Sequence, residues 1–230
     1  SLQYPSTNTS SVLTGNPANV TALQRAASGS GSSDAWTISM WVKPLSDSNE
    51  QTLFYYGGDN LTTEGRIEIT QFSGSNLKMR FGHSTQYLFW FGLGNFIAGQ
   101  FNHIMVTYDG GTSGSTASSI SDYFGRFSFS VNGTNGITTL ANLNSGYSGS
   151  IKADRFKIGN LGNTNYFKGT MHQVAIWDTN EFSNLATIYN SGAVQDLSAL
   201  SSAPAHIYEL GSSISNISDL TGSADLTAFG

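Results

Sequence analysis

The chain has 230 residues, of which ten are Lys or Arg, fifteen are Asp or Glu and none is cysteine, and charged residues make up 11% of it. The absence of cysteine excludes a disulfide framework, a thiolate metal site and a cysteine nucleophile, and a net charge of -5 with scattered basic residues argues against nucleic-acid binding. No apolar run approaches the roughly 18 residues of a membrane-spanning helix, so we expect no membrane insertion.

Alternating large apolar and small polar residues predict strands in the first half of the chain. Trp36 to Val42 follows this period of two, and Pro44 ends the strand because proline cannot donate to a ladder. Trp41 faces the opposite side from Trp36, which predicts that both faces are covered there. The same alternation predicts further strands over residues 66–70, 77–81 and 87–91.

The second half continues this pattern around loops and one helix. Asn132-Gly133 predicts a type I′ hairpin turn, because both residues accept positive φ. The Gly/Ser/Thr-rich stretch from Gly110 to Ser121 indicates a surface loop. Phe182, Leu185, Ala186 and Tyr189 have helical spacing, and Gly192 suits a C-terminal cap. Further strands are predicted over residues 101–108, 127–131, 155–159 and 169–177.

Four segments together resemble the laminin-G-like, or concanavalin-A-like lectin/glucanase, superfamily. They are Trp36–Pro44, Phe101–Gly110, Phe129–Gly133 and Phe167–Trp177, and the resemblance spans about residues 30–195. It implies an all-β fold, a two-sheet antiparallel jelly-roll β-sandwich with one short helix near residues 180–191. It also implies a single domain over residues 1–230 with paired N- and C-terminal strands, in which His206–Leu210 is the closing strand.

That superfamily includes glycanases, so carboxylate pairs matter. Glu64 and Glu68 would face one side of a strand, but four residues of strand place them ~13 Å apart. Glycosidases need their carboxyl groups about 5–9.5 Å apart. With Arg66 between them, the two glutamates predict a solvated charged row, and no G-x-S-x-G motif is present. We therefore expect no enzyme and assign no catalytic residue.

Carbohydrate binding without catalysis needs exposed aromatic rings that stack on sugars. Tyr55, Tyr56, Trp90 and Tyr166 are the candidates for such platforms. The alternative is that these rings are core residues, which is common in sandwiches.

A calcium ion is the one cofactor that the resemblance raises, held by an aspartate and loop oxygens. Asp59 and Asn60 form one candidate group, and Asn160 and Asn163 form another. Calcium prefers six to eight oxygens, and no D-x-D-x-D run supplies them. Asn and Asp beside glycine also form ordinary turns, so both interpretations stay open.

Three functions compete on this evidence. The favoured one is a non-catalytic structural module at a virion surface, a capsid decoration, fibre or tail protein. It rests on a resemblance to phage-type structural members, on the uncharged polar composition, and on the absence of visible linkers and of a secretion signal. Its partners would be other virion proteins or copies of itself, together with cell-surface glycans through weak adhesion. The alternative is an extracellular lectin-like carbohydrate-binding domain, and a glycoside hydrolase ranks last.

Overall fold

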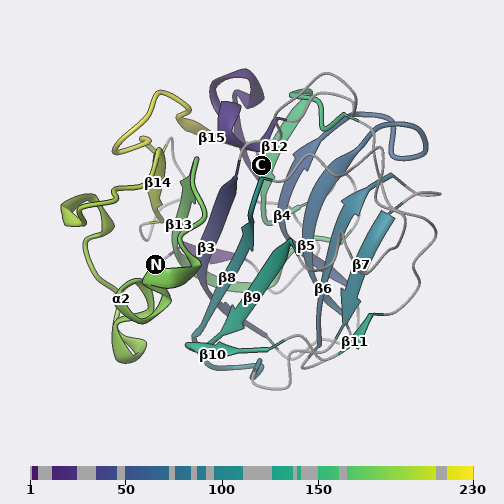
Figure 1. Ribbon diagram of the computed structural model, residues 1–230. Helices are drawn as coiled ribbons and strands as arrows, with labels where there is room; N and C mark the ends of the chain where they lie inside the picture. The colour runs from purple at the N-terminus through teal and green to yellow at the C-terminus, as the bar shows by residue number, and fades with distance from the viewer. Residues whose placement is uncertain are drawn as a thin grey trace.

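The protein is a sandwich of two antiparallel sheets, and the short α-helix that the structure describes lies outside it, as Figure 1 shows. The computed structural model describes residues 2–4, 12–24, 35–45, 50–72, 76–83, 87–91, 96–110, 126–136, 139–140, 150–160, 165–210 and 217–229. The predicted all-β jelly-roll class is confirmed. The predicted loop lies outside the described residues over positions 111–121.

The first sheet has seven strands among the described residues. Their order is β1-β13-β3-β8-β9-β10, and β14 also pairs with β13. The bounds are β1 Leu2–Tyr4, β3 Trp36–Pro44, β8 Asn102–Tyr108, β9 Phe127–Val131, β10 Thr134–Asn135, β13 Gly169–Trp177 and β14 His206–Glu209.

The second sheet has eight strands among the described residues, in the order β11-β7-β6-β5-β4-β12-β2-β15. The bounds are β2 Val12–Gly15, β4 Gln51–Gly57, β5 Arg66–Phe72, β6 Asn76–Gly82, β7 Tyr87–Phe91, β11 Thr139–Leu140, β12 Arg155–Ile158 and β15 Leu226–Phe229.

The core fills the space between the two sheets. Alternate residues of each strand point inward, so large apolar side chains from both sheets meet. Phe81 of β6 contacts Phe127 of β9 edge-on with ring centroids 5.2 Å apart, and it stacks on Tyr108 of β8 at 5.7 Å. Trp36 of β3 joins them, 5.9 Å from Tyr108. These contacts tie the sheets face to face.

The predicted hairpin turn is confirmed. Asn132 and Gly133 both have positive φ, 53° and 72°, and β10 pairs back on β9 directly after them. Primed turns need positive φ at both central residues, which is why Asn-Gly favours them.

The predicted helix is confirmed with a different C-terminal cap. α2 spans Leu185–Tyr189, between the 3-10 turns Phe182–Asn184 and Asn190–Gly192. Asn190 rather than Gly192 takes the left-handed cap position, with φ 47°, since asparagine tolerates this conformation. Other 3-10 turns span Pro17–Asn19, Thr21–Leu23 and Leu197–Ala199. No helix in the described ranges has the length and apolar character to cross a membrane.

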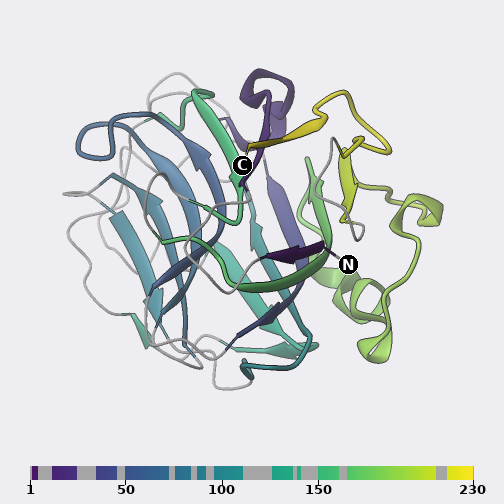
Figure 2. The same ribbon diagram turned by 180° about the vertical axis from the view of Figure 1, so that it is seen from behind.

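The expected pairing between an N-terminal and a C-terminal strand occurs, but His206–Leu210 is not the strand that makes it. β14 was expected to pair with the N-terminal strand, but it pairs with β13, over Gln173–Ile176. β1 pairs with the earlier part of β13, so β1 and β14 share one edge of that strand. The last strand, β15, instead pairs with β2. Figure 2 shows the N-terminus beside β13 and α2, and the C-terminus beside β15 and β12.

Candidate functional site

Two of the proposed sugar platforms are fully buried. Tyr55 and Tyr56 of β4 are 0% exposed. The Tyr55 hydroxyl donates to the carbonyl of Gly58 at 2.5 Å, and the Tyr56 hydroxyl donates to the carbonyl of Pro17 at 3.0 Å. Neither ring faces solvent, so the expectation that they stack on a sugar is wrong. The reason is that β4 lies inside the sheet, between β5 and β12, and was not predicted as a strand.

The other two aromatic candidates are left as predictions. Trp90 lies on β7 opposite Met79 of β6, and its side chain lies outside the described residues. Tyr166 is half-buried in the segment between β12 and β13. The carbonyl of its neighbour Asn165 accepts a hydrogen bond from the amide of Thr52 at 2.8 Å.

The first group of calcium candidates forms a turn. Asp59 makes an ion pair with Arg155 of β12. The side-chain oxygen of Asn60 accepts a hydrogen bond from the Thr62 amide at 3.0 Å, and the Asn60 amide donates to Glu64 at 2.9 Å. These oxygens therefore already have partners within the protein, as in an ordinary Asx turn.

The second group lies at the other end of the same strand pair. Asn160 follows β12 and is buried, whereas Asp59 follows β4, which runs in the opposite direction. Asn163 lies outside the described residues. Within the described ranges, no three His, Cys, Asp or Glu side chains gather in a way that could hold a metal ion. A bound calcium therefore stays a prediction.

A row of polar side chains crosses the outer face of the eight-stranded sheet. Strand register places each member directly opposite the next. The flanking residues of each strand point into the core, so these side chains point away from it. We call this the polar row, and its members are Thr227, Thr14, Lys157, Tyr55, Glu68 and Arg80.

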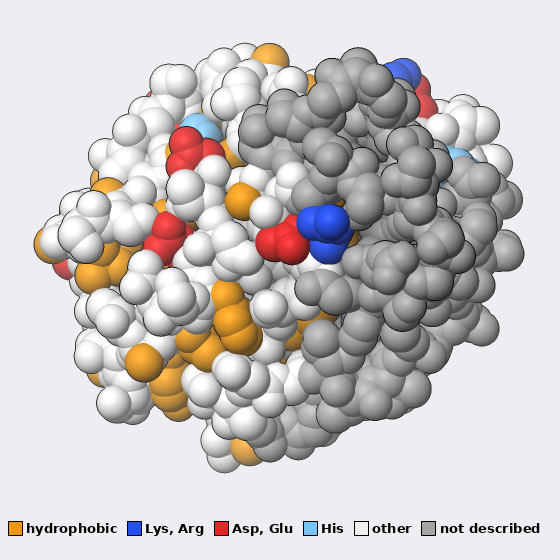
Figure 3. All heavy atoms as spheres, viewed as in Figure 1, with side chains coloured by type: hydrophobic (Ala, Val, Ile, Leu, Met, Phe, Trp, Pro, Cys, Tyr) orange, Lys and Arg blue, Asp and Glu red, His pale blue; other side chains and the backbone are white. Residues whose placement is uncertain are grey.

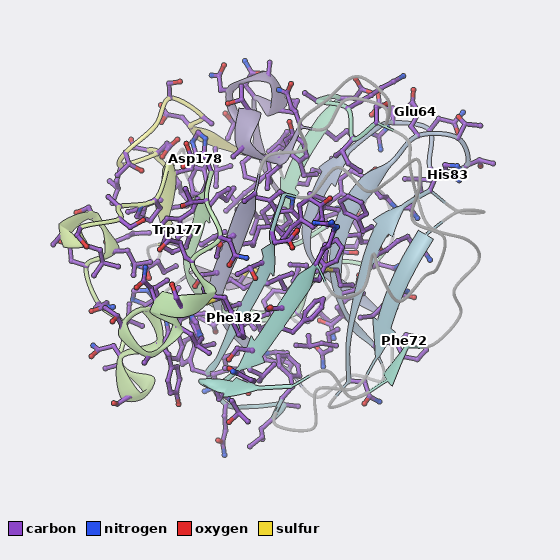
Figure 4. All side chains as sticks on the ribbon, viewed as in Figure 1. Glu64, Phe72, His83, Trp177, Asp178 and Phe182 are labelled. Atoms are coloured by element: carbon purple, nitrogen blue, oxygen red, sulfur yellow. The ribbon has the colours of Figure 1, made fainter. Side chains whose placement is uncertain are left out.

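The middle of the polar row is a buried ion cluster. Glu68 accepts from Arg66 at 2.9 Å and from the Thr70 hydroxyl at 3.2 Å, and it lies 3.6 Å from Arg80. Arg66 is 2% and Glu68 1% exposed, and Arg66 also donates to the Leu61 carbonyl at 2.9 Å. The predicted solvated row is thus wrong. Glu64 lies apart from this cluster, pairs with Lys152, and is labelled in Figure 4 at the upper right.

One end of the polar row is open. Thr227 is exposed, and Thr14 and Lys157 are half-buried. We call these three residues the open end. Neighbouring strands lie ~4.8 Å apart, so two hydroxyls and one ammonium are spread over about 10 Å. Among the described residues, none of the three has a side-chain hydrogen bond or ion pair.

The outer face of the seven-stranded sheet is covered instead. Trp177, Leu185 and Ile188 belong to a second, smaller core between this sheet and the α2 segment, and Figure 4 shows Trp177 and Phe182 on that side. Trp41 of β3 stacks on Tyr189 with centroids 6.0 Å apart. This confirms that β3 is covered on both faces, and it leaves the open end on the other sheet as the candidate site.

Sequence reasoning missed the open end for a clear reason. The alternation in Arg155-Phe156-Lys157-Ile158 is visible in the sequence, and it correctly predicts that Lys157 points away from the core. Placing Thr14 and Thr227 beside Lys157 requires the order β12-β2-β15. That order joins segments more than a hundred residues apart, and no local pattern contains it.

A family model for the concanavalin A-like lectin/glucanases superfamily matches residues 14–184. No match was found among curated proteins.

Several solved structures are similar in fold. A Bacteroides ovatus protein whose name proposes carbohydrate binding has 14% identity and a TM-score of 0.59, over 96% of this chain and 56% of its own. This chain therefore spans little more than half of that protein. A heptameric SAP-like pentraxin from Limulus polyphemus has 16% identity and a TM-score of 0.51, over 81% and 79% of the two chains. The CBM40 of the Ruminococcus gnavus IT-sialidase, bound to α2,3-sialyllactose, has 12% identity and a TM-score of 0.50, over 73% and 97%.

Proposed function

The chain belongs to the concanavalin A-like lectin/glucanases superfamily, and from this premise we propose that it is a non-catalytic glycan-binding module. The observation that carries the proposal is the open end of the polar row. Thr14 and Thr227 can each donate and accept a hydrogen bond, and Lys157 can donate up to three. Sugar hydroxyls need donors and acceptors of this kind, held side by side on a rigid surface.

The similar structures support a binding role through their names. The Ruminococcus gnavus domain is bound to a sialylated sugar, and the name of the Bacteroides ovatus protein proposes carbohydrate binding. At such low identity they share only the fold with this chain, so the site itself has to be argued from its own residues.

The environment of Glu68 argues against hydrolysis at the polar row. A glycosidase needs a carboxylic acid that gives its proton to the leaving oxygen of the sugar. Glu68 is buried, and both of its oxygens face donors or cations within the protein, Arg66, Thr70 and Arg80. Its carboxylate therefore stabilises buried arginine instead of meeting a substrate.

A glycan array tests the proposal. The array carries neutral, sialylated, uronic-acid and sulfated glycans, and bound glycans are then incubated with the protein and analysed for cleavage. We expect binding to at least one class without shorter products. Absence of binding to every glycan would refute the module role, and appearance of cleavage products would refute its non-catalytic character.

The virion-surface location predicted from the sequence stays a prediction, as does the extracellular alternative. Both are compatible with glycan binding, because a virion component and a secreted module can each use it for adhesion. Mass spectrometry of purified virions would detect the chain in the first case and not in the second.

A further inference from the structure

Lys157 is a cation without a partner among the described residues. It is half-buried between Thr14 and Tyr55, its neighbours in register on β2 and β4. Burial lowers the pKa of Lys157, and the charge of Arg155 lowers it further, while Asp59 acts in the opposite direction. Burial is thus the main reason that the ammonium form is disfavoured, and the neighbouring guanidinium adds to it.

Among the described residues of the same face, basic side chains outnumber the carboxylates that pair with them. Five of the chain's ten basic residues lie on it, and three carboxylates pair with them. A chain whose net charge is -5 thus has half of its basic residues on one face of one sheet. The basic residues are Arg66, Lys78, Arg80, Arg155 and Lys157, and the carboxylates are Glu50, Asp59 and Glu68.

The fold also fixes where this cation sits. Phe156 and Ile158, on either side of Lys157, are fully buried in the core. β12 pairs with β2 on one side and with β4 on the other, so its backbone is held along both edges. A ligand group placed on a strand in this way is positioned more exactly than one on a loop.

We propose that the open end binds an acidic glycan, with a carboxylate or sulfate group of the sugar paired with Lys157. Arg155, two residues away on the same face, adds positive charge, and Thr14 and Thr227 bond to neighbouring sugar hydroxyls. This inference rests on the proposed glycan binding. An anion at this position would pair with the Lys157 ammonium and reduce its repulsion with Arg155.

Isothermal titration calorimetry with matched ligands tests the inference. The carboxylate arm compares an oligogalacturonate with its methyl ester, which removes the charge and keeps the sugar rings. The sulfate arm compares a sulfated galactose oligosaccharide with its desulfated form. At low salt we expect about tenfold tighter binding of at least one acidic ligand than of its neutral counterpart, and this advantage should shrink with added salt.

Three substitutions locate the effect. Lys157→Gln should remove the tenfold advantage of the acidic ligand, and Lys157→Arg should keep most of it. Lys43→Gln is the matched control, because Lys43 is also half-buried on a strand but belongs to the seven-stranded sheet. It should change affinity less than twofold. Circular dichroism confirms that each variant is folded.

The outcomes separate this inference from the proposed function. Equal affinity for acidic and neutral partners, or an acidic advantage that survives Lys157→Gln, would overturn the inference and leave glycan binding intact. Absence of binding to all four ligands, together with a blank glycan array, would overturn both.

Discussion

His103 of β8 is a buried histidine held neutral by the fold. It is 0% exposed, its Nε2 lies 2.8 Å from the Ser39 hydroxyl, and its ring packs against those of Trp41 and Tyr189, with centroid distances of 5.0 and 5.7 Å. Burial lowers the pKa of His103 to about 4. The structure thus gives this histidine a packing role.

This lowered pKa predicts a pH-dependent stability. The unfolded chain protonates this histidine below its ordinary pKa of about 6.5, whereas the folded chain resists protonation until about pH 4. Stability is therefore lost as the pH falls through this window, by about 3 kcal/mol at pH 4. Urea unfolding of the wild type and His103→Gln between pH 7 and pH 4 checks this. The unfolding free energy of the wild type minus that of His103→Gln should fall by about 3 kcal/mol between pH 7 and pH 4. A difference that does not change with pH would contradict the prediction.

The Arg66–Glu68 pair predicts a large effect of a small substitution. Glu68→Gln removes one charge and leaves the buried guanidinium of Arg66 without its carboxylate. Breaking a buried pair in this way costs about 3 kcal/mol of unfolding free energy. Glu64→Gln is the control, because the Glu64–Lys152 pair is much more exposed, and it should leave stability nearly unchanged. Denaturant titration of both variants checks this, and equal losses would count against a buried cluster.

At the scale of elements, the β9–β10 hairpin is joined to the α2 segment by Gly133. This residue has φ +72°, and a Cβ there would lie 2.4 Å from the ring of Tyr189. Tyr189 itself stacks on Trp41, so its ring has little room to move. A glycine is thus required both for the turn and for the contact between the two elements.

Gly99 is a control that has the positive φ but not the close side-chain contact. It has φ +80°, but a Cβ there would meet nothing within 4 Å. Gly99→Ala should therefore cost only the backbone strain, about 1 kcal/mol. Gly133→Ala adds the clash and should cost about 3 kcal/mol. Thermal and denaturant unfolding compare the two, and similar losses would show that the Tyr189 contact is unimportant.

The strands also show which parts of the fold can be predicted from the sequence. Alternation over residues 36–42 or 127–131 predicts a strand because one face of it is buried, and Asn132-Gly133 predicts its own turn. β4 was missed because its seven residues are all buried, so they show no alternation. The open end was missed because β2, β12 and β15 meet only through long-range pairing. Periodicity reports one strand's environment, whereas a site assembled across strands depends on topology.

At the scale of the whole molecule, the small share of charged residues in the sequence is also seen on the surface. Figure 3 shows a described surface of mostly uncharged polar and backbone atoms with few charged side chains. Where charge is so sparse, Arg155 and Lys157 on β12 stand out beside the open end. Recognition of an acidic glycan there would combine hydroxyl contacts with one charge-assisted bond.

Calcium should not be required for this recognition. Asp59 is already paired with Arg155, and the side-chain oxygen of Asn60 accepts from the Thr62 amide. Affinity for the acidic glycan should stay within twofold when EDTA replaces calcium chloride in the calorimetry buffer. A tenfold loss on chelation, restored by calcium, would show that an ion takes part.

The central claim is that glycans bind at the open end, and NMR mapping tests it most directly. The ¹⁵N-labelled protein is titrated with the tightest glycan from the array, and the amide shifts are followed. We expect the largest changes at Thr14, Lys157, Thr227 and their neighbours on β12, β2 and β15. Changes confined to another surface, such as the exposed apolar residues Leu45, Ile97 and Phe101, would contradict the claim.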